Sequence, residues 1–153
     1  METLQWLRDR AEVSDTVLRF ARALDEGDWL AFRNCLAEEL YVDYTEFRQE
    51  SAHMTNADDF VAKRAKALNG LHMQHLSTNH LVTINGDQAE CKSCFLIHRI
   101  DEASLGEKNF FDSAGHYIHG LLRVDGSWRI NHIKQSIIWN RGNSEIHGGF
   151  RSK

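Results

Sequence analysis

The sequence predicts an α+β fold, in which a curved antiparallel or mixed β-sheet packs against three N-terminal helices and encloses a pocket. Helical periodicity occurs only before residue 70, whereas the later segments are rich in β-branched and aromatic residues. Helices followed by hairpin-linked strands are typical of this class. A chain of 153 residues is long enough for one core and too short for two, so we expect residues 1–153 to form a single domain.

The first helix is predicted over residues 4–24. Apolar side chains recur in this segment at spacings of three and four residues, which is the pattern of an amphipathic helix with a broad buried stripe. The expected stripe comprises Leu4, Leu7, Ala11, Leu18, Ala21 and Leu24, with Val13, Val17 and Phe20 beside it. The polar sequence Asp-Glu-Gly at 25–27 interrupts the helix.

Two shorter helices and one strand are predicted in the next 45 residues. A second helix follows Asp28, which is its expected N-cap. From residue 40 onward apolar and polar residues alternate, which predicts a half-buried strand whose Tyr44 points inward. Thr55 and Asp58 have the spacing of a capping pair for a third helix that ends near residue 69.

Four strands are predicted after the third helix. The β-rich segments are residues 75–84, 88–100, 111–124 and 127–139. Asn85-Gly86 and Asp125-Gly126 are the strongest turn signals, because both residue pairs favour tight hairpins. The chain has no proline, so no strand is forced to an edge of the sheet.

Composition and charge argue against two classes of partner. The net charge is −4 and no Lys/Arg cluster is present, which disfavours binding to nucleic acid through its phosphates. No segment approaches the roughly 20 apolar residues of a membrane helix. The N-terminus is charged and lacks the apolar core of a signal peptide, so we expect a cytoplasmic location.

Three cysteines, Cys35, Cys91 and Cys94, are expected to be reduced thiols, because an odd number in a chain without a secretion signal does not suggest a disulfide framework. Cys91 and Cys94 form a C-x-x-C sequence. It lies in a predicted strand, where positions three apart face opposite sides of the sheet. Neither redox chemistry nor a zinc site is therefore expected from this pair.

The sequence LHMQHLSTNH places His72, His75 and His80 within nine residues. Spacings of three and five on a strand scatter the rings over both faces, and no H-E-x-x-H sequence is present. We therefore expect no metal and no other cofactor. Protein ligands of zinc more often come from one helix face or from paired loops.

Asp25 suggests a different role for His75. A carboxylate at the C-terminal end of a helix is electrostatically unfavourable, so a compensating partner is expected. An inward Asp25 could accept a hydrogen bond from one nitrogen of His75, which would fix the tautomer and make the other nitrogen a better base. Asp25 could instead only cap or join two helices, with His75 a hydrogen-bonded strand residue, and the spacing alone favours this structural interpretation.

Four segments of the chain share a pattern with a known family. They are ARALDEGDWLAFRNCLAEELYVDY, MQHLSTNHLVTINGDQAECKS, AGHYIHGLLRVDGSWRINHI and WNRGN. In this order they resemble the SnoaL-like branch of the nuclear-transport-factor-two-like superfamily, over about residues 5–143. The resemblance implies a cone-shaped fold. It does not define one activity, because this fold hosts cyclases, isomerases, dehydratases, hydrolases and binding proteins.

The resemblance also implies site residues. Scytalone dehydratases, bile-acid dehydratases and hexachlorocyclohexane dehydrochlorinases share an Asp–His dyad, and Asp25 and His75 match its two positions. His80 is implied to be structural. Phe20 departs from the pattern, because bile-acid dehydratases have a tyrosine and dehydrochlorinases a lysine five residues before the dyad aspartate. Tyr44 and His116 are the expected replacements for this missing acid group.

Some expectations about the pocket follow from the strand pattern and the resemblance together. Tyr117 and His119 face away from His116 if their strand is regular, so the three cannot line one pocket. The expected substrate contacts are Phe20, Val42, Met73 and His132.

The expected activity is that of a cofactor-independent lyase or isomerase acting on an apolar, cyclic, oxygenated small molecule. His75, oriented by Asp25, would be the general base. The alternatives are a SnoaL-like polyketide cyclase, which closes a ring by an aldol step, and a non-catalytic binding or assembly module. A homodimer or higher homo-oligomer is implied by the resemblance, and residues 136–143 could supply contact surface or a lid.

Overall fold

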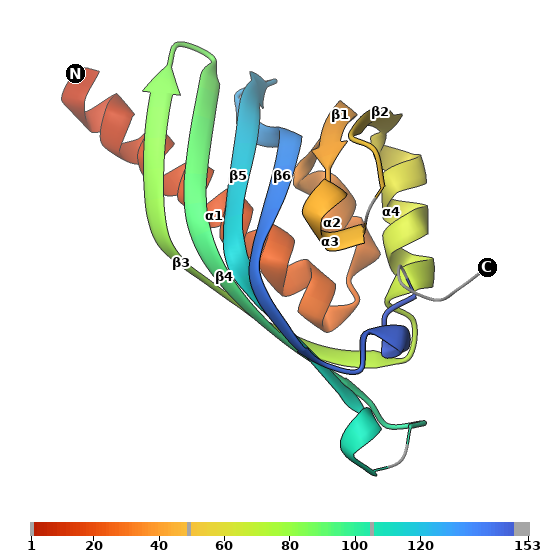
Figure 1. The fold of residues 1–153 in the computed structure, drawn as a ribbon. Coiled ribbons are helices and arrows are strands. Elements are labelled where there is room, and N and C mark those ends of the chain that lie inside the picture. Colours follow the sequence, from red (N-terminus) through yellow and green to blue (C-terminus); the bar gives the residue numbers. More distant parts are fainter. Residues whose placement is uncertain (1, 49, 105, 149–153) are drawn as a thin grey trace.

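The computed structural model describes residues 2–48, 50–104 and 106–148, and in these residues six strands form one curved, open sheet with helices on its inner face (Figure 1). The helices are α1 (Glu2–Glu26), α2 (Trp29–Asn34), α3 (Thr45–Arg48) and α4 (Ala57–Ala67), with 3₁₀ turns η1 (Gly106–Lys108) and η2 (Ser144–Ile146). The strands are β1 (Leu36–Asp43), β2 (His53–Asn56), β3 (Leu71–Asn85), β4 (Gln88–Asp101), β5 (Phe110–Val124) and β6 (Ser127–Gly142).

The strand order β2-β1-β6-β5-β4-β3 makes the sheet mixed. β1 runs parallel to β6, and all other neighbours are antiparallel. The expected α+β architecture is therefore confirmed. None of the described helices is long and apolar enough to cross a membrane.

Helix α1 crosses the inner face of the sheet, but its buried stripe differs from the expected one. Val13, Val17 and Phe20 are buried, whereas Leu4 and Leu7 are exposed. The first turns of α1 extend past β3, the edge strand, so no sheet lies beneath them (Figure 1). Leu18, which lies well inside the helix, is exposed as well. The apolar periodicity was therefore a correct indication of a helix and a wrong indication of which of its faces is buried.

The helix caps agree with the sequence at α2 and differ by one residue at α4. The Asp28 side chain accepts a hydrogen bond from the Ala31 N–H at 2.9 Å, as expected of the N-cap of α2. The N-cap of α4 is Asn56 and not Thr55. Asn56 Oδ1 accepts from the Asp59 N–H at 2.8 Å, and its Nδ2 donates to the Asp59 carboxylate at 2.7 Å. Asn is preferred to Thr at the N-cap, and the Thr55 hydroxyl donates instead to the Asn56 carbonyl at 3.3 Å.

Strand β1 ends earlier than expected, before Tyr44. Asp43 Oδ1 accepts hydrogen bonds from the Thr45 N–H at 3.1 Å and the Thr45 hydroxyl at 2.6 Å, which stops the strand and starts α3. Neither α3 nor the short edge strand β2 was predicted. Tyr44 is nevertheless buried on the inner side, as the alternation indicated.

An irregularity in β3 decides which of its side chains face the helices. The register of β3 shifts between Thr78 and Leu81, where Asn79 has a φ of 57°. A bulge of this kind moves the alternation by one residue. His75 and His80 consequently share the inner face, although a regular strand would separate them. His72 is exposed on the outer face.

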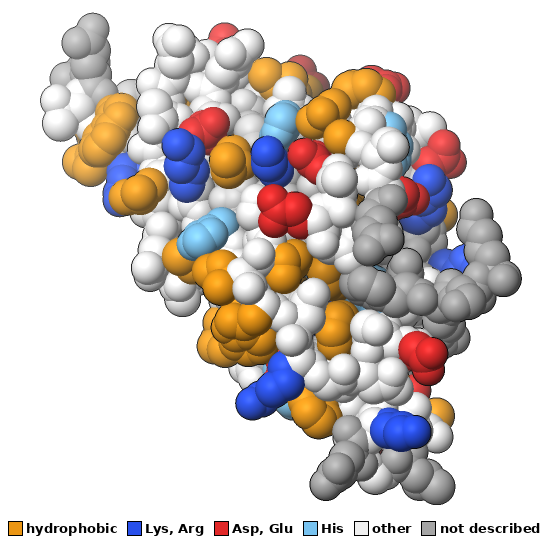
Figure 2. Space-filling view, in the orientation of Figure 1, with side chains coloured by type: hydrophobic (Ala, Val, Ile, Leu, Met, Phe, Trp, Pro, Cys, Tyr) orange, Lys and Arg blue, Asp and Glu red, His pale blue; other side chains and the backbone are white. Residues whose placement is uncertain are grey.

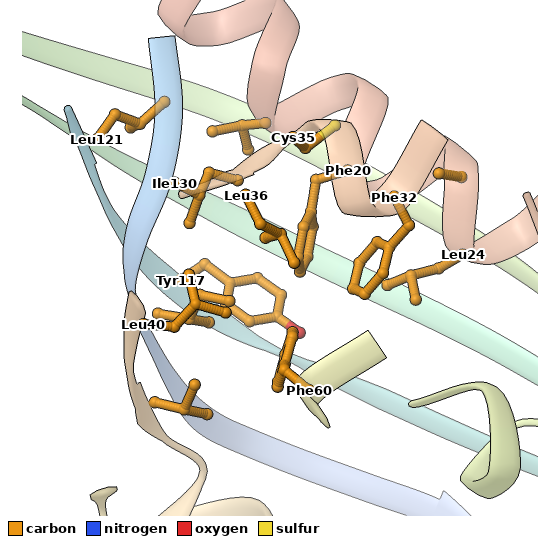
Figure 3. Close-up of a cluster of buried hydrophobic side chains, with 14 of the residues drawn as sticks. Phe20, Leu24, Phe32, Cys35, Leu36, Leu40, Phe60, Tyr117, Leu121 and Ile130 are labelled. Carbon is orange, nitrogen blue, oxygen red and sulfur yellow. The ribbon is translucent and has the colours of Figure 1, made fainter. Parts of the chain in front are cut away.

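The core lies between the helices and the inner face of the sheet (Figure 3). Phe20 and Phe32 meet with ring centroids 4.9 Å apart, and Leu40 and Ile130 are fully buried beneath them. The three cysteines are free, and Cys91 is fully buried. Cys94, on the opposite face, is only partly buried, so the C-x-x-C sequence does not bring two thiols together.

Asp9 fixes the N-terminal half of α1 to the β5–β6 hairpin. Its carboxylate accepts hydrogen bonds from Arg123 Nη1 at 2.9 Å and from Trp128 Nε1 at 3.2 Å. The Arg123 hydrogen bond lowers the pKa of Asp9. This buried carboxylate thus remains charged and paired, which orients α1 across the sheet.

His119 is a buried histidine without a hydrogen-bond partner on either ring nitrogen. Its ring lies between those of Phe20 and Tyr117, at centroid distances of 5.3 and 4.9 Å. Burial lowers its pKa from 6.5 to about 3, with smaller contributions from His80 and His132. The folded protein therefore excludes the imidazolium form of His119.

Acid is predicted to destabilise the fold through His119. Below pH 6.5 the His119 side chain binds a proton in the unfolded chain but not in the folded one. The free energy of unfolding therefore decreases as the pH falls below 6.5. The expected slope from this group is about 1.4 kcal/mol per pH unit down to pH ~4, where carboxylates also titrate. Urea unfolding of the wild type and of His119→Leu at several pH values measures it. His116→Leu, which removes an exposed histidine from the same strand, is the control and should keep the wild-type slope.

Candidate active site

The site begins with two contacts between the end of α1 and the middle of β3. Asp25 Oδ1 accepts a hydrogen bond from His75 Nδ1, and Asp25 Oδ2 accepts one from the His75 backbone N–H at 2.8 Å. The side chains are 20% and 8% exposed, respectively. Because Nδ1 bears the hydrogen that is donated in the bond to the carboxylate, the free lone pair of the neutral imidazole is on Nε2.

A small cavity of about 30 Å³ lies beside His75. Its walls come from the end of α1, from α3 and α4, from β3 to β6 and from the segment after η2. They comprise Leu24, Tyr44, Phe47, Arg48, Arg64, Leu68, Met73, His75, Arg99, Tyr117, Gln135 and His147. The free space suits one or two water-sized groups.

Two tyrosines in this cavity are held as neutral phenols. Burial raises the pKa of Tyr44 to about 12. Burial also raises the pKa of Tyr117 well above its usual value, and the Tyr117 hydroxyl accepts a hydrogen bond from Gln135 Nε2 at 2.7 Å. Neutral phenols at a cavity can donate hydrogen bonds to an oxygen of a bound molecule.

Three arginines among the described residues also line the cavity, and the sequence analysis did not identify them. Arg48 comes from α3, Arg64 from α4 and Arg99 from β4. Arg99 donates to the Phe111 carbonyl at 3.3 Å and to the Ser113 hydroxyl at 3.0 Å. Burial lowers the pKa of Arg99 to about 10, which still leaves it a cation at neutral pH.

The other expected site residues are not all near this cavity. Met73 lines it beside His75. Phe20 and Val42 are buried in the core and do not line the cavity. His116 is exposed on the outer face of the sheet, because its neighbours along β5 alternate inward. His116 is therefore too remote to serve as the expected acid.

His132 is a second correction. It lies on the outer face of the sheet, where its ring is 5.0 Å from that of Tyr41. In a regular strand, His132 would face the same side of the sheet as Ile130, which is the inner side. The register shift opposite Gly120 and Leu121 inserts an extra residue and turns His132 outward.

The histidine cluster of β3 does not form a metal site. His80 hydrogen-bonds through its two ring nitrogens to the hydroxyls of Ser14 and Ser77, each at 2.8 Å. His72 is 3.6 Å from Glu102. Among the residues that the structure describes, no group of three or more His, Cys, Asp or Glu side chains could hold a metal ion.

The fold and the sequence define the class of this protein. The SnoaL-like domain family matches residues 5–134. The chain therefore belongs to the SnoaL-like domain family. No curated protein matches the chain by sequence.

Several solved structures have the same fold. The Kfla4162 protein of Kribbella flavida has a TM-score of 0.85 at 19% identity, over 93% of this chain and 97% of that chain. A scytalone dehydratase-like protein of Novosphingobium aromaticivorans has a TM-score of 0.78 at 15% identity, over 91% of this chain and 90% of that chain. The type 2 hexachlorocyclohexane dehydrochlorinase LinA has a TM-score of 0.76 at 16% identity, over 95% of both chains. At these sequence identities the structural similarity establishes only a shared fold.

Replacing Asp25 with Asn is predicted to destabilise the protein and to release the His75 ring. The amide cannot accept from the ring and from the backbone N–H as the two carboxylate oxygens do, and the expected loss is about 1–3 kcal/mol of unfolding free energy. Urea unfolding measures the loss, and ¹⁵N shifts of the ring report the tautomer. Glu26→Gln, an exposed neighbour, should change stability by less than about 0.5 kcal/mol. Equal effects of the two substitutions would contradict the assignment.

Proposed function

We propose that the chain is a cofactor-independent lyase of the dehydratase type, or an isomerase, that acts on an oxygenated, largely apolar cyclic small molecule. The observation that carries this proposal is the hydrogen bond that His75 Nδ1 donates to Asp25, beside a cavity that His75 lines. Two of the structural neighbours bear the names of a dehydratase and a dehydrochlorinase, and both names describe eliminations.

In the proposed reaction, Nε2 of His75 removes a proton from a carbon of the substrate. The C–H electron pair forms a carbon–carbon double bond, and a hydroxyl on the neighbouring carbon leaves with its bonding pair. Asp25 stabilises the imidazolium that forms, through the Nδ1 hydrogen bond. In an isomerisation the same imidazolium returns the proton to a different carbon.

Tyr44 is the proposed acid. Its phenol gives a proton to the departing hydroxyl, so that water leaves, or donates a hydrogen bond to an oxyanion in an isomerisation. The proton removed by His75 restores the phenol afterwards. The position of Tyr44 supports this role, because Tyr44 lines the same cavity as His75 and its phenol is protonated at neutral pH.

The small volume of the cavity limits how the substrate binds. About 30 Å³ admits one functional group and not a ring. The reactive end of the substrate would therefore enter while its apolar part rests against the walls near Leu24, Leu68 and Met73, or those walls would move apart.

Two other functions are compatible with the same fold. A polyketide cyclase would use the same base for an aldol ring closure, and product analysis separates the two because elimination releases water. A non-catalytic binding or assembly module has no need of an oriented imidazole. The contact between Asp25 and His75 therefore favours an enzyme.

The outer face of the sheet is suited to a homodimer. Leu76, Leu96, Ala114 and Trp139 are paired in one row across β3, β4, β5 and β6. Three of them are large and exposed, and hydrophobic side chains gather on this face (Figure 2). Exposed apolar patches commonly mark protein interfaces. We propose that two copies of the chain pair through this row.

His75→Ala is predicted to abolish proton removal from carbon. In D₂O, wild-type protein should promote H/D exchange at carbon in members of a panel of cyclic ketones and hydroxyketones, measured by NMR. The variant should be slower by about 10²–10⁴. His98→Ala is the matched control, because His98 forms a similar pair with Asp112 on the outer face. Exchange that persists in folded His75→Ala protein would overturn the role of His75.

Tyr44→Phe is predicted to lower kcat by about 10²–10³ with little change in KM, because the lost hydroxyl acts on charge that develops in the transition state. The ring remains and keeps its contact with the Arg48 guanidinium, whose carbon is 4.6 Å from the ring centroid. Steady-state kinetics on the substrate found by exchange measures the effect. Tyr41→Phe, on the outer face, should leave kcat unchanged.

A further inference from the structure

Three arginines line the cavity beside His75, and no carboxylate of the described residues pairs with them. They are Arg48, Arg64 and Arg99, and no Asp or Glu in the described part of the chain lines the cavity with them. In the part of the chain that the structure describes, none of the three forms an ion pair with a carboxylate. Glu50 acts on Arg48 and Asp112 acts on Arg99 only at a distance.

Aromatic rings hold these guanidiniums in place. The Arg48 and Arg64 guanidinium carbons lie 4.6 and 5.6 Å from the centroid of Tyr44. The Arg99 guanidinium carbon lies 5.3 Å from the centroid of Phe47. Cation–π contacts orient a guanidinium, but they recover only part of the cost of removing a cation from water.

Two hydrogen-bond donors of this cluster also lack partners. Arg64 is 6% exposed and Arg99 is 3% exposed. The Nε atoms of Arg48 and Arg64 are buried without a hydrogen bond. Buried polar groups in folded proteins are almost always paired, so two unpaired donors at one cavity indicate a missing ligand that accepts hydrogen bonds.

We propose that Arg48, Arg64 and Arg99 bind a carboxylate of the substrate, so that the molecule acted on is a small carboxylic acid with an apolar body. This inference rests on the proposed function, because it assigns the substrate class of the same cavity. Guanidinium forks match the planar carboxylate in size and hydrogen-bond geometry. The cavity, of about 30 Å³, has room for such a group.

A carboxylate held there would position the rest of the substrate for reaction. The arginines would anchor one end, and His75 and Tyr44 line the same small space. Carbon atoms next to the anchored group would therefore lie within reach of Nε2. Anchoring also explains why cations are kept in a buried cavity, since sites for binding often reduce the stability of the free protein.

Binding of simple probes tests the inference without turnover. Isothermal titration at constant ionic strength compares acetate and benzoate with acetamide and benzamide, which have similar shapes and no charge. The carboxylates should bind and the amides should bind at least about tenfold more weakly. Inorganic phosphate should also be weaker than benzoate. Equal binding of benzoate and benzamide, tighter binding of phosphate, or no binding of either carboxylate would overturn the proposal.

Arginine variants assign the binding to this cluster. Arg48→Met, Arg64→Met and Arg99→Met should each weaken benzoate binding by about tenfold or more. Arg22→Met, an exposed arginine on α1, should not. The Tm of Arg48→Met and Arg64→Met should be unchanged or higher, because methionine fills the space without a buried charge. Arg99→Met should lower the Tm, because Arg99 donates hydrogen bonds to the Phe111 carbonyl and the Ser113 hydroxyl. Unchanged benzoate affinity in the variants that fold would overturn the assignment.

The variant His75→Ala separates this inference from the proposed function. It should bind benzoate as the wild type does while it fails to exchange carbon-bound hydrogen. If benzoate binds but His75→Ala still exchanges, the catalytic role is wrong and the carboxylate site stands. If exchange depends on His75 but benzoate does not bind, the carboxylate site is wrong and the base stands.

Discussion

The carboxylate of Asp25 joins the end of the longest helix to the middle of an edge strand, and the arrangement of the site depends on this contact. One oxygen accepts from the ring of His75 and the other from its backbone N–H. Holding both groups fixes the position of the strand and the direction of the ring together. It also offsets the poor placement of a negative charge at a helix C-terminus, because the imidazole N–H and the amide N–H both donate to it.

The inner face of the sheet has an apolar part and a polar part, which have different roles. In the apolar part, Phe20, Phe32 and the neutral His119 pack closely, and this part supplies stability through buried area. In the polar part, Arg64 and Arg99 are buried as cations among aromatic rings. Local departures from the usual rules of burial commonly mark functional sites, and here they coincide with the cavity beside the imidazole.

Local sequence patterns predicted much of the fold and part of the site. Alternation placed Tyr44 on the inner side, and the Asp125-Gly126 turn forms with both φ values positive, at 49° and 79°. The short elements α3 and β2 were missed, because a side-chain cap on Thr45 and pairing with β1 create them. His132 was misplaced because an inserted residue in β6 reverses the alternation, and residue types alone do not reveal a bulge.

The sequence by itself determined the α+β class, the order of the long elements and, through the resemblance, the two residues Asp25 and His75. The fold class and the order of elements follow from periodicity and turn signals, which are properties of neighbouring residues, whereas the pair of Asp25 and His75 was implied by the resemblance. Only the tertiary structure decided that Arg48, Arg64 and Arg99 meet at one cavity. They lie on three elements separated by long stretches of chain, and the curvature of the sheet and the packing of helices on its inner face bring them together. Their proximity depends on contacts between residues far apart in the chain, so it cannot be predicted from a local sequence pattern.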